Sequence, residues 1–332
     1  MRREYTSHGD AANGLLNGMA LACAPGDMRA TVLLLAGLAL QQQATFRTEV
    51  AMVRVDAEVL HQGQPVEELT KEDFQVTDNG ERREILHFAH QEEPLDVILL
   101  FDTSASMQPV VKRISQTANA ALGELRDGDR VAVRAFSRGS DLLLDFTTDF
   151  DAVRDAMQRV LRRPFIPHSE LQRGIDDAAL HFLKEPRTNR RRAIVAITDG
   201  LGNGRAADAV EHLWQADTVV SGMIVRSAQM AVTFRIVRPD TLFSGGMGGI
   251  SEDSGGDAVK FDDAGEGLRQ MIHRLRLRYT IGYAMPAATP GQRREITVHL
   301  IGDAARRYQK AQVRARTGYV VPTREAGQRQ SK

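Results

Sequence analysis

One stretch of the chain places a carboxylate and two hydroxyls where they could do chemistry. Residues 95–106 (LDVILLFDTSAS) begin with an almost unbroken apolar run and end with Asp102, Ser104 and Ser106. Such a run predicts a strand buried on both faces, as in a parallel sheet covered by helices. Sites in these sheets open where the strand ends. Oxygen-only ligands with few charges suit a hard cation such as Mg²⁺, with Mn²⁺ or Ca²⁺ as alternatives.

A second carboxylate follows another apolar run. Residues 192–200 (RAIVAITDG) predict a buried strand that ends at Asp199. Short polar residues after strands also cap helices and turns, and for either loop alone that structural role is an equally good interpretation. Two such loops, each directly after a buried strand, favour a metal site.

The D-x-S-x-S pattern of residues 102–106 resembles the metal-ion-dependent adhesion site (MIDAS) of the von Willebrand factor A (VWA) family. In that family the metal is held by this loop, by a Thr from a second loop and by an Asp from a third. The resemblance implies these metal ligands: Asp102, Ser104, Ser106, Ser169 and Asp199. Ser169 stands where the family has Thr, after Pro167-His168. Serine lacks the methyl group that restrains the threonine rotamer, so we expect a less preorganised second loop.

The resemblance also implies how the centre would bind a protein. Neutral hydroxyls would contact the cation directly, and the carboxylates would act largely through water. The cation would then accept one more anionic oxygen, which an Asp or Glu carboxylate of a partner protein can supply. This arrangement predicts adhesion that depends on a divalent cation.

The elements around these loops predict an α/β protein. Strands alternate with amphipathic helices over residues 94–278, which indicates a doubly wound, mostly parallel sheet of the VWA (Rossmann-like) type flanked by helices. Residues 46–91 and 279–322 instead show the alternation of half-buried strands, and we expect them to pair into one small β-sandwich. Residues 323–332 are polar and predict a disordered tail.

The first 45 residues predict a leader. Residues 30–40 (ATVLLLAGLAL) form an apolar run after Met28-Arg29, which is typical of a signal peptide and too short for a transmembrane span. Translation would then start at Met28, and the mature protein would be secreted, periplasmic or in the cell envelope. A lipoprotein signal ending at Cys23 is the rival, but no adequate apolar run precedes it. Cys23 is the only cysteine, which excludes an intramolecular disulfide or a thiolate zinc site.

Charge and histidine spacing exclude other functions. The 332 residues include 43 basic and 43 acidic side chains, so no global field recruits nucleic acid or an anionic membrane. Residues 187–192 (RTNRRR) are expected to form a solvated loop. The nine histidines show no HExxH-type spacing.

The resemblance extends beyond the motif. The segments TFRTEVAMVRVDAEVL, LTKEDFQVTDNGE, YTIGY and VRARTGYVVP are similar to those of the VWFA-related domain proteins abundant in acidobacteria. This likeness covers nearly all of the expected mature chain and implies a secreted or envelope protein.

Three functions compete. The leading hypothesis is a non-enzymatic protein-binding module with a metal-held adhesion site. A phosphoryl-transfer hydrolase using Asp102 and Mg²⁺ is the alternative, but its chemistry commonly needs a second carboxylate where Ser104 stands. A serine hydrolase is disfavoured because no G-x-S-x-G surrounds the serines. The third possibility is a metal-free VWA scaffold.

Overall fold

The computed structural model describes residues 51–167, 169–200, 207–225 and 246–323, which belong to one compact unit, Val50–Lys332. In this described part, six strands form one sheet in which neighbours are parallel except for the edge strand β8. In spatial order they are β11 (Ala258–Phe261), β10 (Thr218–Val225), β9 (Arg191–Thr198), β6 (Leu95–Asp102), β7 (Arg130–Phe136) and β8 (Ser140–Thr147).

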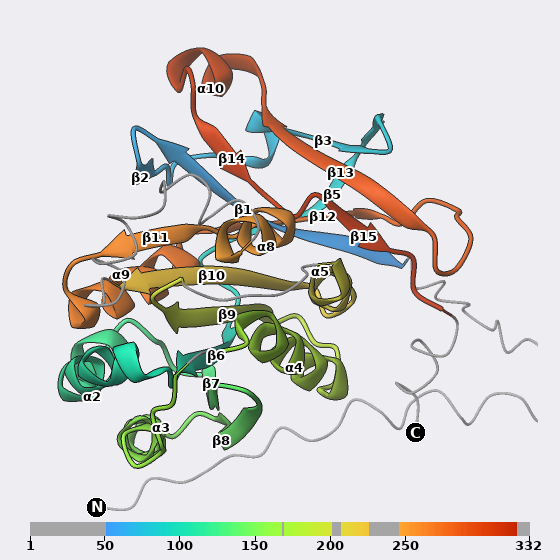
Figure 1. Ribbon diagram of the computed structural model, residues 1–332. Helices are drawn as coiled ribbons and strands as arrows, with labels where there is room; N and C mark the ends of the chain where they lie inside the picture. Colours follow the sequence, from blue (N-terminus) through green and yellow to red (C-terminus); the bar gives the residue numbers. More distant parts are fainter. Residues whose placement is uncertain (1–50, 168, 201–206, 226–245, 324–332) are drawn as a thin grey trace, which may run out of the picture. The chain divides into compact units, whose positions relative to one another are not determined.

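Helices cover both faces of this sheet (Figure 1). One face carries α2 (Gln108–Leu122), α3 (Phe150–Val160) and α9 (Ala264–Arg276). The other carries α4 (Leu171–Lys184), α5 (Ala207–Gln215) and α8 (Met247–Ser254). All eight residues of β6 are buried, as its apolar run predicts, with alternate side chains packed into the two cores. The expected doubly wound α/β architecture is therefore confirmed.

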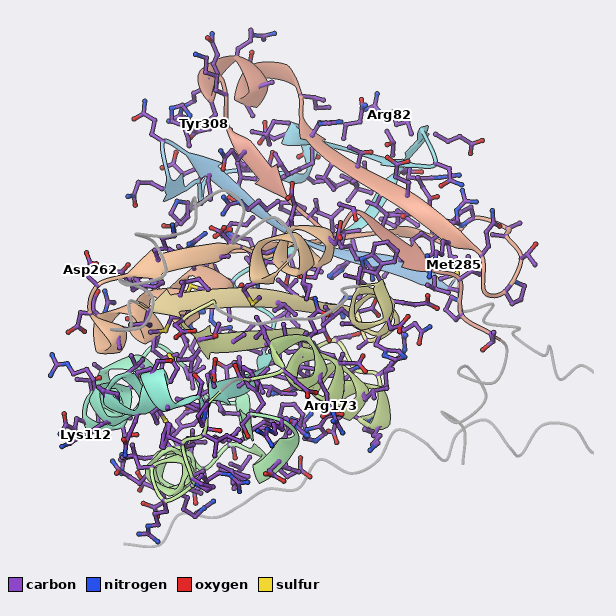
Figure 2. All side chains as sticks on the ribbon, viewed as in Figure 1. Arg82, Lys112, Arg173, Asp262, Met285 and Tyr308 are labelled. Atoms are coloured by element: carbon purple, nitrogen blue, oxygen red, sulfur yellow. The ribbon has the colours of Figure 1, made fainter. Side chains whose placement is uncertain are left out.

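Local sequence signals explain where these helices begin and which face they bury. Asp149 caps α3, where its carboxylate accepts hydrogen bonds from the backbone amides of Asp151 and Ala152 at 3.0 and 3.1 Å. In α2 the apolar face, which includes Val111 and Ile114, is buried. Figure 2 shows Lys112 on the outer side of the same helix.

The flanking strands form two antiparallel sheets around one further core. The first has the order β14-β1-β12-β5, with β2 paired to β1, and the second has the order β15-β13-β3-β4. Both sheets contribute side chains to this core, so they form the expected sandwich from the two flanks. The bounds are β1 (Met52–His61), β2 (Gln64–Pro65), β3 (Phe74–Asp78), β4 (Glu81–Arg83), β5 (Ile85–His90), β12 (Tyr279–Ala284), β13 (Arg293–Leu300), β14 (Gln312–Arg314) and β15 (Gly318–Val320).

Pairing between the flanks holds the ends of the α/β region together. β12 lies between β1 and β5, and Tyr279 is the register partner of both Ala57 and His90. The imidazole of His90 stacks on the Tyr279 ring, with centroids 4.3 Å apart. The chain therefore enters and leaves the α/β region at one neck, between His90 and Tyr279.

Two sequence interpretations need correction. The alternation in QVRARTGYVV predicts one strand, but this segment is divided between β14 and β15, which belong to different sheets, and a short helix, α10 (Gly302–Arg307), precedes it. The prediction of a solvated loop at 187–192 is wrong for its last two residues, because Arg191 and Arg192 are buried in β9. Arg191 donates to the carbonyl oxygens of Leu275 and Arg278, at 3.0 and 3.1 Å, where α9 ends.

The predicted leader, including Met28 and Cys23, lies outside the described residues, as does the tail from residue 324. None of the described helices is long and apolar enough to cross a membrane. The domain limits and the signal peptide therefore stay predictions.

Candidate metal centre

The candidate centre lies at the point of the sheet where successive strands of the chain are added on opposite sides. From β6 the chain adds β7 on one side, whereas β9 and then β10 lie on the other. Asp102 ends β6, and Asp199 directly follows the neighbouring parallel strand β9. Such a switch point at the carboxyl ends of parallel strands is where ligands bind in this class of sheet.

Asp102 is the centre of a hydrogen-bond network. Its Oδ1 accepts from the backbone amide of Ser104 at 2.8 Å, which fixes the tight turn leaving β6. Its Oδ2 accepts from the hydroxyls of Thr198 and Ser169, at 2.8 and 3.1 Å. Three chain segments, far apart in sequence, therefore converge on one carboxylate.

The environment of Asp102 disfavours its negative charge. The side chain is fully buried, and no Lys or Arg among the described residues forms an ion pair with it. Burial raises the pKa of Asp102 to about 6, and the nearby charge of Asp199 acts in the same direction. The hydrogen bonds from Ser104 and Thr198 oppose this rise only in part.

The hydroxyl pair connects the first carboxylate loop to the second. Ser106 Oγ donates to Asp199 Oδ2 at 2.7 Å, and Ser104 Oγ lies 3.3 Å from Ser106 Oγ. The short helix η2 (Ala105–Met107) follows Ser104 and turns the chain so that both hydroxyls lie on the same side. Asp199 is itself almost completely buried.

Backbone hydrogen bonds hold the loop that carries Ser169. Ile166 forms an isolated bridge with Ser104, in which Ala105 N donates to Ile166 O at 3.0 Å. On the other side of Ser169, the amide of Glu170 donates to Ser137 O at 2.7 Å. The loop thus delivers the Ser169 hydroxyl to Asp102, although residue 168 lies outside the described residues.

The donor set fits a hard divalent cation. Two buried carboxylates and three hydroxyls supply only oxygen, which Mg²⁺, Mn²⁺ and Ca²⁺ prefer. A cation would offset the cost of burying the Asp102 charge near that of Asp199. The structure brings together all five residues named from the sequence; that they ligate a metal stays a prediction.

Thr198 is a residue that the sequence interpretation missed. Its hydroxyl donates to Asp102 and accepts from the amide of Gly200 at 3.1 Å, so it orients both carboxylate loops. The available signal was a polar residue at the end of the apolar run of β9, directly before Asp199.

One protein-family model matches part of the chain. Residues 97–201 match the von Willebrand factor type A domain. No curated protein sequence matches the chain.

Similar solved structures share only low identity with the chain. An aerotolerance-related membrane protein from Bacteroides fragilis is 16% identical with a TM-score of 0.43, over 55% of this chain and 98% of its own. BatB from Bacteroides thetaiotaomicron is 20% identical with a TM-score of 0.42, over 55% and 97%. Manganese-loaded TRAP protein from Plasmodium vivax is 13% identical with a TM-score of 0.40, over 73% and 97%. These likenesses are too low to assign a ligand to this chain.

Proposed function

We propose that this chain, whose residues 97–201 match the von Willebrand factor type A domain, is a non-enzymatic interaction module whose binding depends on a divalent cation. One observation supports the proposal most strongly: the buried Asp102 carboxylate accepts from Ser104 and Ser169, and Asp102 itself forms no ion pair with a described Lys or Arg. A divalent cation held there would offset the buried charge of Asp102.

We propose Mg²⁺ as the cation and an Asp or Glu carboxylate of a partner protein as its last ligand. Ser104, Ser106 and Ser169 would present neutral oxygens, so the cation would keep enough positive charge to attract that carboxylate. Asp102 and Asp199 would hold the hydroxyls and the cation's water in place. The predicted signal peptide at residues 30–40 supports a secreted, periplasmic or cell-envelope location.

The position of Asp102 argues against the hydrolase alternative. A nucleophilic carboxylate needs an oxygen directed at the substrate, whereas Asp102 is fully buried and both its oxygens accept hydrogen bonds. The position two residues later is Ser104, which supplies no second carboxylate for acid–base work. We therefore expect no turnover of p-nitrophenyl phosphate with Mg²⁺.

The test is calorimetric titration of Mg²⁺ and Mn²⁺ into the full chain and into Asp102→Ala. Asp303→Ala is the matched control, since this carboxylate lies on α10 of the sandwich and is almost fully exposed. Saturable binding that is lost in Asp102→Ala and kept in Asp303→Ala would support the metal centre. Equal binding by all three proteins would refute it.

Partner capture separates the adhesion module from the metal-free scaffold. Immobilised protein should retain envelope proteins in Mn²⁺ and release them in chelator, and Asp102→Ala should retain none. Capture that is unaffected by chelator would instead identify a scaffold. Steady p-nitrophenyl phosphate turnover lost in Asp102→Ala would identify the hydrolase.

A further inference from the structure

A second group of ligand-type side chains lies away from the Asp102 centre. Asp145 is on the edge strand β8, while His181 and Glu185 are at the end of α4. One ligand atom from each of the three lies within 4.8 Å of the others. His181 and Glu185 are four residues apart, which places them on the same side of the helix end, facing β8.

The two centres are at opposite ends of the sheet. Asp102 pairs with Phe136 at the carboxyl end of β7. Asp145 lies between Leu144 and Thr147, whose partners are Val133 and Val131 toward the start of β7. A single metal ion therefore cannot contact both groups.

We propose that Asp145, His181 and Glu185 form a second divalent-cation site that binds Zn²⁺. One imidazole and two carboxylates are a donor set that zinc accepts, with water completing the coordination. Donor atoms within 4.8 Å of one another need only small side-chain movements to reach zinc–ligand distances of about 2.0–2.2 Å. This site is independent of the proposed adhesion function.

The state of His181 is a separate observation that points to a ligand. Only 8% of the residue is exposed, and its Nδ1 has no hydrogen-bond partner among the described residues. Its Nε2 lies 2.9 Å from Asp145 Oδ1, and its ring lies against Phe146, with centroids 5.2 Å apart. Packing against Phe146 therefore holds the ring with Nε2 toward the Asp145 carboxylate, so Nε2 is the nitrogen placed to ligate a cation.

Arg130 sets which cation this site selects. Its Nη2 lies 3.2 Å from Glu185 Oε2, while its guanidinium also forms two hydrogen bonds with Asp96, at 2.6 and 3.0 Å. No described residue hydrogen-bonds Glu185 Oε1. A cation must therefore share Glu185 with a guanidinium, which favours zinc, a strong imidazole binder, over the weakly binding Mg²⁺.

The test is a Zn²⁺ titration of the metal-free full chain, carried without a histidine tag, that counts tight equivalents by calorimetry. His181→Gln should lose one equivalent, and Asp145→Asn should bind it at least tenfold more weakly. His212→Gln is the matched control, because His212 is also a helical histidine paired with an aspartate, Asp176, at 2.5 Å. It should bind zinc as the unchanged protein does.

The same variants decide against the proposal. Zinc isotherms that are identical in Asp145→Asn and the unchanged protein would overturn it, as would an equal loss in His212→Gln. Circular dichroism melts without metal check folding. If His181→Gln unfolds, Asp145→Asn decides alone, since the Asp145 side chain is 67% exposed and its change leaves the core intact.

Discussion

Replacing Asp102 with Asn should stabilise the metal-free protein at neutral pH, although it removes a proposed metal ligand. Asn has nearly the same shape as Asp and carries no charge. The replacement therefore tests whether the buried charge is the unfavourable part of the site. The experiment is done in chelator, so that no cation offsets that charge.

The size and pH range follow from the pKa of Asp102, which burial raises from 3.8 to about 6. Because the pKa of this acid is higher in the folded than in the unfolded state, its ionisation destabilises the folded protein. The penalty is absent below pH 3.8, grows between pH 3.8 and 6, and is complete above pH 6. At about 1.4 kcal/mol per pKa unit, the full penalty is roughly 3 kcal/mol. Asn has one acceptor oxygen where Asp has two, so either the amide of Ser104 or the hydroxyls of Thr198 and Ser169 lose their acceptor, and the gain is at most this value.

Urea unfolding at several pH values measures the difference between the two proteins. The free energy of unfolding of Asp102→Asn should exceed that of the unchanged protein by up to roughly 3 kcal/mol at pH 7, and by almost nothing at pH 4. Adding Mg²⁺ should narrow or reverse the order, since a cation at a hundred times its dissociation constant stabilises the unchanged protein by about 2.7 kcal/mol. A destabilised Asp102→Asn at pH 7, with a difference independent of pH, would refute the argument.

Three further changes have defined outcomes. Ser169→Thr should bind Mn²⁺ severalfold more tightly than the unchanged protein, because the added methyl restrains the hydroxyl, and Ser169→Ala more weakly; calorimetry measures both. Arg191→Met should lower the free energy of unfolding by about 2–4 kcal/mol, because the carbonyl of Leu275 loses a buried charged donor; urea unfolding against Arg187→Met, an exposed arginine, checks this. Gly174→Ala should cost about 1–3 kcal/mol and lower Tm, because a Cβ there would lie 2.7 Å from Cγ of Phe136; an unchanged Tm would contradict this.

The sequence predicted best where one physical requirement dominates. The apolar run of β6 must be covered on both faces, and the structure places this strand between two layers of helices. An Asn-Gly pair is typical of a tight hairpin, and Asn79 and Gly80 both adopt the positive φ that such a turn needs. Asp102, Ser104, Ser106 and Asp199 could be identified because they lie at or directly after the end of a buried strand, whereas Ser169, which precedes α4, was named from the family resemblance alone.

No sequence pattern indicates a side chain that hydrogen-bonds a group far away in the chain. Arg191 looked like part of a solvated basic run, but its guanidinium satisfies carbonyl oxygens at the end of α9, more than 80 residues away. Thr198 reaches Asp102 across the strand pair β6 and β9, and no spacing within either strand indicates that contact. His181 joins Asp145 only because β8 folds back beside α4.

The neck between His90 and Tyr279 also determines how the protein responds to a pulling force. If the chain is held at residues before β1 and after β15, tension runs through the sandwich strands and not through the α/β region, because β5 and β12 are paired with each other across the neck. Those hydrogen bonds must break before any load reaches the helices around Asp102. The Asp102 centre therefore lies outside the path of a force applied at those two positions.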